Sequence, residues 1–438
     1  MKHLLKSESG AALIVALGTL VILSLLGAAA LTVANGSIDQ TVWDRSSNQA
    51  FEVAEAGFNQ AVYKARAKTL TAGTYQIAMA NGQASVSVTG AGGIFTVKAT
   101  GAQPNLASPK ARRAIEGRVN MLNPYDMMFA NGDGNDGESG FKTEGTATIN
   151  GPVYARDLLK MTGSTKIIGG PVYIKDNPAT PSPTGDLLMT NSSQIGTAVS
   201  PIPLFVDGYY SVLDSAKLYA NPIYTNVPDL TMPSVTGVDM PAYRLKANVV
   251  IDNDAVTDGD TPLTLDAIHV SQTWGTYPGG YYLKWTKTGA KTATLEIKGT
   301  VFVDGDVKIG DANTNDVNIT FSGNGTIVAN GKIAVESNFT PAGGASTFPA
   351  TNLIGFVSPD EAEVEPRAGA TVYGVFYGYK EFEIEKQCTF YGSGMSNGVE
   401  IENNPQINIV TNISAYLPAG MPAVTGLTSL TDWREVRP

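Results

Sequence analysis

The sequence predicts a mainly β protein with one long N-terminal α-helix, a small antiparallel sheet after it, and then a parallel β-helix-like body. Charged residues make up only 16% of the chain, and 47 glycines punctuate stretches rich in Thr, Asn and Val, which favours short strands and tight turns. One apolar segment near the N-terminus is as long as a spanning helix, and a short motif recurs later at a fixed spacing. A chain of 438 residues is expected to form two or more domains.

The N-terminal segment is predicted to be a membrane helix. Residues 9–38 carry no charge, and residues 11–34 are almost wholly apolar. As a helix the apolar part is about 36 Å long, enough to cross a hydrocarbon core of about 30 Å. Lys6 precedes the span and Asp39 follows it, so the positive-inside rule places the N-terminus in the cytoplasm and the remainder outside the cytoplasmic membrane.

A cleaved secretory signal peptide is the alternative interpretation, because small residues near Ala28 and Ala34 suit a signal peptidase. Its apolar core would be unusually long, however, and the helical pattern does not stop after it. No proline occurs before position 69, and Phe51, Ala54 and Phe58 recur at helical spacing. We therefore expect one helix over 11–68, roughly 87 Å long.

Two stretches of this helix resemble the PilX-type minor pilins of type IV pilus assembly, which carry a class III prepilin signal. They are SESGAALIVALGTLVILSLLG and AFEVAEAGFNQAV, and together they cover about the first 65 residues. The resemblance implies that residues 1–10 are a leader, and that a prepilin peptidase cuts between Gly10 and Ala11. It also implies that the mature helix packs with other major and minor pilins in membrane lipid and then in a surface filament. The implied filament-packing residues are Val15, Phe51, Ala54, Glu55, Gly57 and Phe58.

Val15 differs from the residue expected in this family, because most major pilins carry a glutamate five residues into the mature chain. A carboxylate there would balance the amine of a neighbouring subunit inside lipid. A subunit without it is expected at or near the filament tip, where its absence costs least. Some pilin-like proteins of type II secretion also lack the glutamate, so a secretion pseudopilus is the alternative to a pilus.

The region 69–122 is predicted to form the small antiparallel sheet. Residues 84–90, 94–101 and 112–120 each alternate apolar and polar side chains, and a glycine-rich turn joins the first two. The loop sequence NGDGNDGESG at 131–140 indicates a boundary nearby. We therefore expect 123–438 to be one large extracytoplasmic domain.

The motif Gly-Pro-Val-Tyr occurs at 151–154 and again nineteen residues later at 170–173, which indicates stacked coils. Residues 300–415 also resemble the glycine-punctuated β-helix that follows PilX-like N-termini. Antiparallel hairpins are the alternative, because Asp304-Gly305 and Asn330-Gly331 are hairpin signals. Ten of the 24 prolines fall in about 176–262, and proline cannot donate to a strand ladder, so this region is expected to be an insertion of long excursions.

Composition and motifs argue against several functions. A net charge of −10 repels phosphate backbones, so no nucleic acid is expected as a partner. Without the leader, His269 is the sole histidine of the sequence, which argues against a multi-histidine metal site. The Gly394–Gly398 stretch matches a nucleophile elbow but precedes a strand-like sequence, and the alternating glutamates at 381–385 are expected to form a solvated strand face. We therefore expect no enzyme and no cofactor.

Two weaker ligand sites remain as expectations. An aromatic cluster either packs in the core or binds a glycan or surface as part of a filament-borne adhesin, and it consists of Trp274, Tyr277, Tyr281, Tyr282 and Trp285. The spacing of Asp311, Asn313 and Asn315 is that of a calcium loop, although the glycine that such a loop needs is missing.

Overall fold

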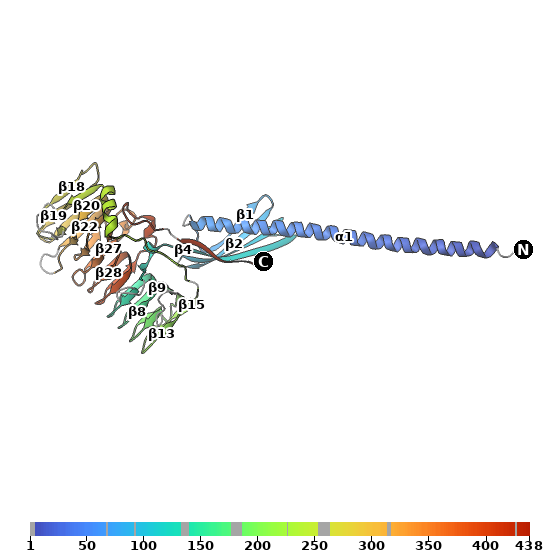
Figure 1. Ribbon diagram of the computed structural model, residues 1–438, viewed down its shortest axis with the longest axis horizontal. Coiled ribbons are helices and arrows are strands. Elements are labelled where there is room, and N and C mark those ends of the chain that lie inside the picture. Colours follow the sequence, from blue (N-terminus) through green and yellow to red (C-terminus); the bar gives the residue numbers. More distant parts are fainter. Residues whose placement is uncertain are drawn as a thin grey trace. The chain divides into compact units, whose positions relative to one another are not determined.

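The computed structural model describes residues 5–66, 69–91, 93–132, 140–176, 186–225, 227–252, 263–312, 317–424 and 427–438 (Figure 1). The chain divides into two compact units. The first, called here the helix–sheet unit, comprises Met1–Met121 together with Thr428–Pro438. The second, called here the β body, comprises Leu122–Leu427. Together they confirm the predicted fold class of one long helix, a small antiparallel sheet and a large, mostly parallel β body.

The helix–sheet unit is built on α1 (Leu5–Arg66), which runs without interruption for 62 residues. Every described side chain from Leu13 to Arg45 is exposed, whereas one face of the following turns is buried. Ala54, Phe58 and Ala61 on that face form a hydrophobic cluster with the strands below them. The same helix therefore has an unpacked half and a packed half.

A five-stranded sheet completes this unit in the order β1-β2-β3-β4-β32. Its strands are β1 (Gly73–Met79), β2 (Gly82–Ala91), β3 (Ile94–Gln103), β4 (Ala111–Leu122) and β32 (Leu427–Val436). The first four pair antiparallel along the chain, as the alternating pattern predicts. The last strand of the protein joins the edge of β4, so the prediction that 123–438 forms one domain is wrong at its C-terminal end. Strand pairing across more than 300 residues leaves no local signal in the sequence.

The β body stacks short strands in two sets. The ten-stranded set runs β13-β10-β8-β6-β30-β28-β26-β23-β21-β17. Its members are β6 (Gly140–Thr143), β8 (Leu159–Met161), β10 (Leu187–Met189), β13 (Tyr210–Val212), β17 (Leu263–Leu265), β21 (Val307–Ile309), β23 (Ile333–Val335), β26 (Glu361–Val364), β28 (Glu381–Ile384) and β30 (Gly398–Ile401).

The second set consists of seventeen described strands that range from two to thirteen residues in length. They are β5 (Met128–Ala130), β7 (Thr148–Arg156), β9 (Lys166–Lys175), β11 (Gln194–Ile195), β12 (Ile202–Val206), β14 (Lys217–Leu218), β15 (Ala220–Tyr224), β16 (Val249–Asp252), β18 (Gln272–Gly275), β19 (Tyr282–Gly289), β20 (Thr292–Asp304), β22 (Asn318–Ala329), β24 (Phe339–Pro341), β25 (Leu353–Ser358), β27 (Thr371–Gly378), β29 (Thr389–Ser396) and β31 (Gln406–Ile409). Within the described ranges, a short helix, α2 (Met240–Lys246), and single-turn helices at 124–126, 237–239, 345–347 and 413–415 lie between strands.

Pairing in the β body is almost entirely parallel. The two copies of the Gly-Pro-Val-Tyr motif lie on neighbouring parallel strands, with Val153 opposite Val172 and Tyr154 opposite Tyr173. Asp304-Gly305 turns the chain from β20 into β21, which belongs to the other set, so it forms a corner rather than a hairpin. Asn330-Gly331 does the same between β22 and β23. Among the described residues of the β body, β19 is the strand that pairs antiparallel, with β18 on one side and β20 on the other.

The chain path through the stack begins in the middle. From β6 it moves outward through β8 and β10 to β13 at one end, and it reaches the opposite end at β17. It then returns through β21, β23, β26 and β28 to β30, which pairs with β6. Figure 1 shows this path as green strands at one end, yellow strands at the other and red strands returning to the centre. Residues 227–248, inside the predicted proline-rich insertion, lie on the crossing between the two ends.

Candidate filament-packing helix and surfaces of the β body

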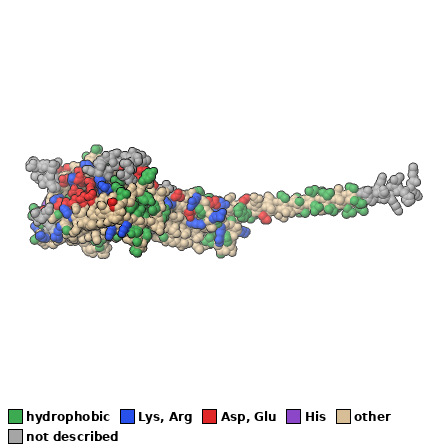
Figure 2. Space-filling model, turned by 90° about the horizontal axis from the view of Figure 1, so that it is seen from below, with side chains coloured by type: hydrophobic (Ala, Val, Ile, Leu, Met, Phe, Trp, Pro, Cys, Tyr) green, Lys and Arg blue, Asp and Glu red, His purple; other side chains and the backbone are tan. Residues whose placement is uncertain are grey.

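The first half of α1 presents an apolar surface on all sides. Leu17, Leu20 and Leu23 are each more than half exposed, and an 18-residue stretch of this helix reaches a mean hydropathy of 2.5 with none of it buried. Figure 2 shows these hydrophobic side chains standing uncovered along the rod. Exposed apolar surface of this extent marks a site that meets lipid or other apolar helices. By length and composition this is a candidate membrane span.

The second half of α1 packs against its own sheet. A Cβ atom on Gly57 would come within 2.9 Å of Cβ of Ala84, and one on Gly101 of β3 would come within 2.1 Å of the carbonyl oxygen of Ala50. Glycine at both positions therefore lets the helix and the sheet approach closely. This contact gives a physical reason for the glycine in the stretch AFEVAEAGFNQAV.

The implied filament-packing residues divide between the two halves. Ala54, Gly57 and Phe58 are buried and Phe51 is half-buried, all on the sheet side, so they are used within this chain. Val15 and Glu55 are exposed. Gly10 and Ala11, the two residues predicted at the processing site, lie in the backbone of α1, and the side chain of Ala11 is outside the described residues.

The C-terminal strand is held to β4 by ion pairs. Arg113 binds both carboxylate oxygens of Glu435 and donates a hydrogen bond of 2.8 Å to Oγ of Ser47 on α1. Arg434 pairs with Glu116 at 3.1 Å. The hydrogen bond from Arg113 holds the pKa of Glu435 below its ordinary value. The chain end is thus fixed to the same unit as its beginning.

Residues 227–248, called here the strap, cover one outer face of the β body. The strand register lines up eleven side chains into an outer row that is separate from the inner core. Nine of the eleven are buried, and the row consists of Val250, Phe302, Val328, Val357, Tyr377, Met395, Phe129, Tyr154, Tyr173, Phe205 and Tyr224. The strap contributes the buried side chains Val227, Leu230, Val235 and Met240. An apolar row of this length needs such a cover.

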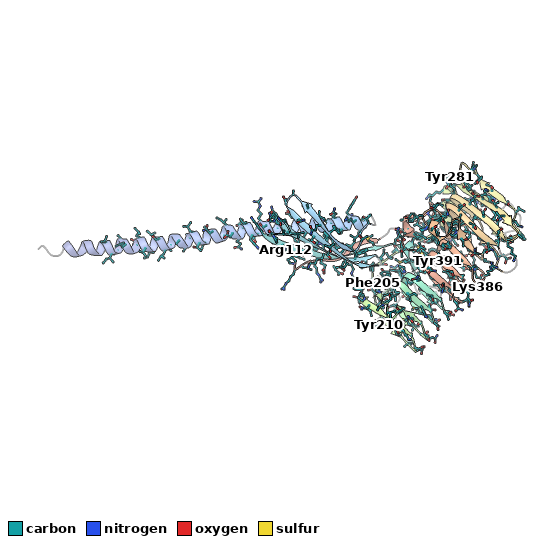
Figure 3. All side chains as sticks on the ribbon, turned by 180° about the vertical axis from the view of Figure 1, so that it is seen from behind. Arg112, Phe205, Tyr210, Tyr281, Lys386 and Tyr391 are labelled. Atoms are coloured by element: carbon teal, nitrogen blue, oxygen red, sulfur yellow. The ribbon has the colours of Figure 1, made fainter. Side chains whose placement is uncertain are left out.

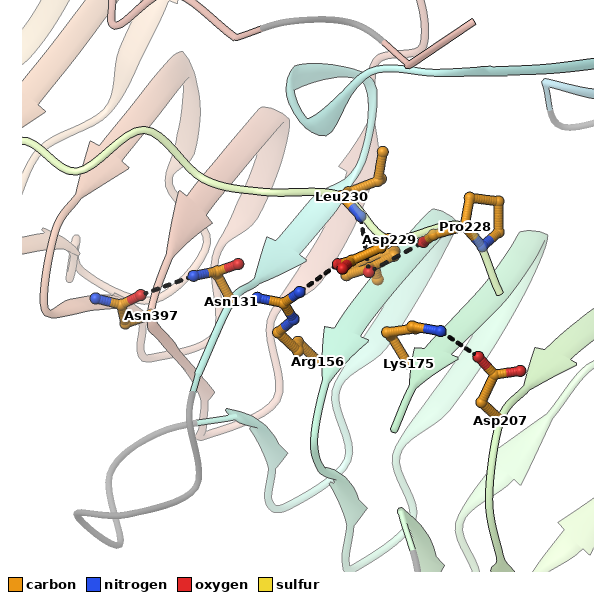
Figure 4. Close-up of polar contacts among 9 residues, drawn as sticks. Asn131, Arg156, Lys175, Asp207, Pro228, Asp229, Leu230 and Asn397 are labelled. Atoms are coloured by element: carbon orange, nitrogen blue, oxygen red, sulfur yellow. Dashed lines mark hydrogen bonds and ion pairs between the residues drawn. The ribbon is translucent and has the colours of Figure 1, made fainter. Parts of the chain in front are cut away.

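Two tyrosines of the outer row bind the backbone of the strap. The hydroxyl of Tyr154 donates to the carbonyl of Pro228 at 3.2 Å and accepts the N–H of Leu230 at 3.2 Å. Figure 4 shows these bonds beside the ion pair of Arg156 with Asp229. They satisfy backbone groups that the strap, having no ladder partner there, would otherwise bury unpaired.

The strap also borders a cavity. Its volume is about 420 Å³, and it lies between the strap and residues 420–423. Val235, Tyr243 and Met421 contribute apolar lining, and Asp239 and Lys246 contribute charge. Asp239 also accepts hydrogen bonds from the backbone N–H and the hydroxyl of Thr236, so one of its carboxylate oxygens already has hydrogen-bond partners within the strap.

The predicted aromatic cluster divides into buried and exposed members. Trp285 is only 1% exposed and donates a hydrogen bond from its indole N–H to the carbonyl of His269 at 3.3 Å. Trp274 is half-buried and stacks on the His269 ring. Tyr282 is also half-buried, but Tyr281 beside it is 52% exposed. The two tryptophans therefore belong to the core of this end of the stack, and Tyr281 has the accessible ring.

Tyr277, a further member of the predicted cluster, lies at the same hairpin. It is exposed, its ring meets that of Tyr282 edge-on at 4.7 Å, and Nζ of Lys284 lies 4.0 Å above its centroid. The exposed surface of this hairpin consequently combines two tyrosine rings and a cation. Aromatic rings placed in this way suit stacking on sugars or on a protein partner.

Glutamates stack on the outer face of the ten-stranded set. Glu363 pairs in register with Glu383, and Glu383 with Glu400, so three carboxylates occupy neighbouring strands. Phe382 and Ile384 point inward and are fully buried, as the alternation predicts. Partial burial and the neighbouring carboxylates raise the pKa of Glu383 to about 8. Figure 2 shows acidic side chains gathered on this part of the body.

Two residues of the predicted calcium loop, Asn313 and Asn315, lie outside the described residues. Asp311 is described, and beside it the backbone N–H of Ala312 donates to Glu336 at 3.3 Å. Across the described ranges, no three His, Cys, Asp or Glu side chains are close enough together to hold a metal ion. Ser396 of the elbow-like motif is buried within β29, where a hydrolase nucleophile would stand exposed on a turn.

A solved pilin structure has a fold similar to that of this chain. Neither a family model nor a curated protein sequence matches the chain. The crystal structure of the competence-associated pilin ComZ from Thermus thermophilus is similar, with a TM-score of 0.55 and 16% sequence identity over 89% of this chain and 97% of that one. The PilX type that the sequence suggests is a finer assignment than this likeness supports. The chain has the fold of a pilin that carries a large β body.

Proposed function

We propose that this protein is a minor pilin, a structural subunit that is anchored in the cytoplasmic membrane by α1 and displays the β body outside. The main support for this proposal is that α1 has an exposed apolar half and a second half that packs on the protein's own sheet. The pilin-like fold supports it. In this account the protein acts through packing with other pilins rather than through catalysis.

The apolar half of α1 acts first in the membrane and then in the assembled filament. In the membrane it contacts lipid, with Lys6 on the cytoplasmic side and Asp39 outside. After a prepilin peptidase has cut between Gly10 and Ala11, the same surface packs among the helices of other major and minor pilins. Lateral contacts then involve residues 11–45 and the exposed Glu55, because Ala54, Gly57 and Phe58 are occupied by the protein's own sheet.

The position in the filament follows from two features. Val15 offers no carboxylate to the amine of a neighbouring subunit, and a β body of about three hundred residues on every subunit would obstruct a tightly packed shaft. We infer a rare subunit at or near the tip of a type IV pilus or related filament. Immunogold labelling of the β body should mark filament ends, and labelling along the shaft would contradict this position.

Deletion of the gene, followed by complementation, tests the assembly role. Loss of the protein should reduce surface pili, and the native chain should restore them. A Leu23→Asp chain should fail, because a carboxylate at the centre of a span costs about 3 kcal/mol of insertion free energy. Gln60→Asp is the matched control, since residue 60 is exposed on the same helix beyond the apolar half. Unchanged piliation in the deletion strain would argue against an assembly role.

A second function, adhesion, is favoured by the exposed rings of Tyr277 and Tyr281. In this role the displayed β body binds a glycan or another surface. A glycan array probed with the detergent-solubilised chain should show binding that Tyr281→Ala weakens. Tyr63→Ala is the control, because Tyr63 is an exposed tyrosine of α1. Binding that survives Tyr281→Ala and Tyr277→Ala together would exclude this hairpin as the site.

A further inference from the structure

The hairpin formed by β18 and β19, called here the tyrosine hairpin, presents a ring that is both fixed and accessible. Its turn is closed by a backbone hydrogen bond of 2.9 Å from the N–H of Thr276 to the carbonyl of Tyr281. The Tyr281 ring lies against β20, because a Cβ atom on Gly299 would come within 2.5 Å of its Cδ1 atom. Tyr281 is nevertheless 52% exposed, and Figure 3 shows it at one end of the stack.

Beside this ring, outward-facing side chains of three neighbouring strands line up in register. Tyr282 of β19 is opposite Lys298 of β20, and Lys298 is opposite Asn324 of β22. Leu283 and Ile297, the next residues along β19 and β20, point into the core and are buried. Because side chains alternate along a strand, the row faces solvent, with Lys298 and Asn324 exposed. A phenol ring, an ammonium and an amide thus stand about 5 Å apart on one surface.

Lys298 carries a positive charge that the protein itself does not neutralise. Its two neighbours in the row are uncharged, and within the described part of the chain it forms no ion pair. Glu296, on the same face of β20, is bound to Nζ of Lys284 at 2.9 Å. Lys284 also lies over the Tyr277 ring, so its ammonium is used in building the hairpin. Lys298 is therefore the cation of this row that remains available to a ligand.

The segment that carries the hairpin is basic, although the chain as a whole is acidic. Residues 263–300 contain four lysines and two acids, Asp266 and Glu296, and so have a net charge of +2 in a chain of −10. Asp266 is only 4% exposed, and its carboxylate accepts the backbone N–H groups of Ile268 and His269. A local positive potential of this kind attracts an anionic ligand to this end of the β body.

We propose that the tyrosine hairpin binds an acidic glycan, a chain in which carboxylate-bearing sugars alternate with neutral ones. This inference rests on the adhesion function and names the ligand class. A sugar ring stacks on Tyr281, and a carboxylate of the same glycan pairs with Lys298. Asn324 donates a hydrogen bond of 3.4 Å from its amide to the carbonyl of Tyr416, and its own oxygen accepts a sugar hydroxyl.

A neutral glycan and a nucleic acid suit this surface less well. A neutral glycan would place no counter-charge beside Lys298. A nucleic acid strand carries a phosphate on every nucleotide and needs a groove lined by cations along its length, whereas the row offers one available ammonium. The net charge of −10 would repel the remaining phosphates. A glycan with spaced carboxylates needs stacking and a single ion pair.

Binding of labelled hexasaccharides to the full chain in detergent micelles tests this inference. The acidic probe alternates glucuronic acid with N-acetylglucosamine, and the neutral probe is the same hexasaccharide with its carboxylates converted to methyl esters. Fluorescence anisotropy should show saturable binding of the acidic probe with a Kd on the order of 1 mM. The neutral probe should bind about fivefold more weakly, because it lacks the exposed ion pair. Raising the salt concentration should reduce this difference.

Variants separate the charge from the stacking. Lys298→Gln should bind the acidic probe about fivefold more weakly and leave binding of the neutral probe unchanged, because Lys298 acts through the carboxylate. Tyr281→Ala should weaken binding of both probes, since stacking does not depend on charge. Lys166→Gln is the matched control, because Lys166 is an exposed strand lysine of the same β body, and it should bind as the native chain does. Thermal unfolding of each variant checks that the β body is intact.

Equal binding of the two probes would overturn the inference and leave adhesion standing, because the hairpin would then recognise sugars without regard to charge. The inference is also overturned if Lys298→Gln binds both probes as the native chain does, or if a single-stranded oligonucleotide with the same number of charges binds more tightly than the acidic probe. If neither probe binds, the acidic-glycan inference alone is overturned, since a glycan array signal that Tyr281→Ala removes would still support adhesion.

Discussion

Tyr154 and Tyr377 hold the strap in the same way from two places on the outer row. Each hydroxyl donates to a proline carbonyl and accepts the N–H two residues later, at Pro228 and Leu230 for Tyr154 and at Pro233 and Val235 for Tyr377. Met395 and Phe129 lie between the two tyrosines in the register. Three strand spacings, about 14 Å, match five residues of extended chain, about 16 Å. The strap therefore runs along the stack axis.

Removing either hydroxyl should loosen the strap. Tyr154→Phe and Tyr377→Phe keep the ring but leave one backbone N–H and one carbonyl unpaired in a buried place, which costs about 1–3 kcal/mol for each variant. Amide hydrogen exchange should accelerate at Leu230 in the first variant and at Val235 in the second. Tyr391→Phe is the control, because the Tyr391 ring is held by stacking on Tyr373. Equal exchange rates in all three variants would show that the hydroxyls do not hold the strap.

The close approach of α1 to its sheet predicts opposite effects for two helix glycines. Gly57→Ala places a methyl group 2.9 Å from Cβ of Ala84, so the helix–sheet unit should lose about 1–3 kcal/mol of unfolding free energy. Gly36→Ala meets nothing within 4 Å and should leave stability unchanged or slightly raised. Thermal unfolding of the two variants in detergent measures the difference. A Gly57→Ala chain as stable as the native one would mean that the helix lies further from the sheet.

The raised pKa of Glu383 predicts a pH-dependent stability of the β body. Folding disfavours the charged form, so the native state holds its proton longer than the unfolded state does. Stability is therefore greatest below the ordinary carboxyl pKa of about 4.5 and falls as the pH rises towards about 8. Glu383→Gln should be more stable than the native chain at pH 8 and equal to it at pH 4. With solvent screening, the gain is on the order of 1 kcal/mol.

Glu435 provides the control of opposite sign. Its pKa is lowered by Arg113, so its contribution is present at neutral pH and lost as the pH falls through the acid range. Glu435→Gln should therefore destabilise the helix–sheet unit at pH 7 and have little effect at pH 3. Urea unfolding at these pH values compares the two variants. The pH account would be wrong if both variants shifted stability in the same direction.

The C-terminal strand should be needed for the stability of β4. Deleting residues 428–438 removes β32 together with the partners of Arg113 and Glu116, and exposes the edge of β4. Amide exchange in β4 should accelerate, while exchange in β20 of the β body stays the same. If β4 remains protected in the truncated chain, the pairing with β32 is dispensable.

Much of the fold was predictable because its signals are local. An uninterrupted apolar and then helical pattern predicts α1, and alternation predicts β2, β3 and β4. The recurrence of Gly-Pro-Val-Tyr predicts the parallel register in which Tyr154 meets Tyr173. The Asn-Gly and Asp-Gly pairs were ambiguous, because the same turn residues serve corners between strand sets as well as hairpins.

Other features depend on contacts between distant residues, which one sequence does not reveal. Nothing near β32 indicates that it pairs with β4, and nothing near Pro228 indicates that Tyr154 binds its carbonyl. The helix pattern identified Ala54 and Phe58 as packing residues but could not say whether they meet the chain's own sheet or another subunit. Likewise, Trp285 and Tyr281 share one sequence cluster, yet one is buried and the other exposed.

Whether the mature chain keeps its apolar helix in the membrane decides between a minor pilin and a secreted protein. Intact mass measurement of the protein extracted from cells, combined with separation of membrane and medium, gives both its first residue and its location. A minor pilin should begin at Ala11, retain the apolar half of α1 and need detergent for extraction. A mature chain that begins near Asn35 and is released into the medium would contradict it.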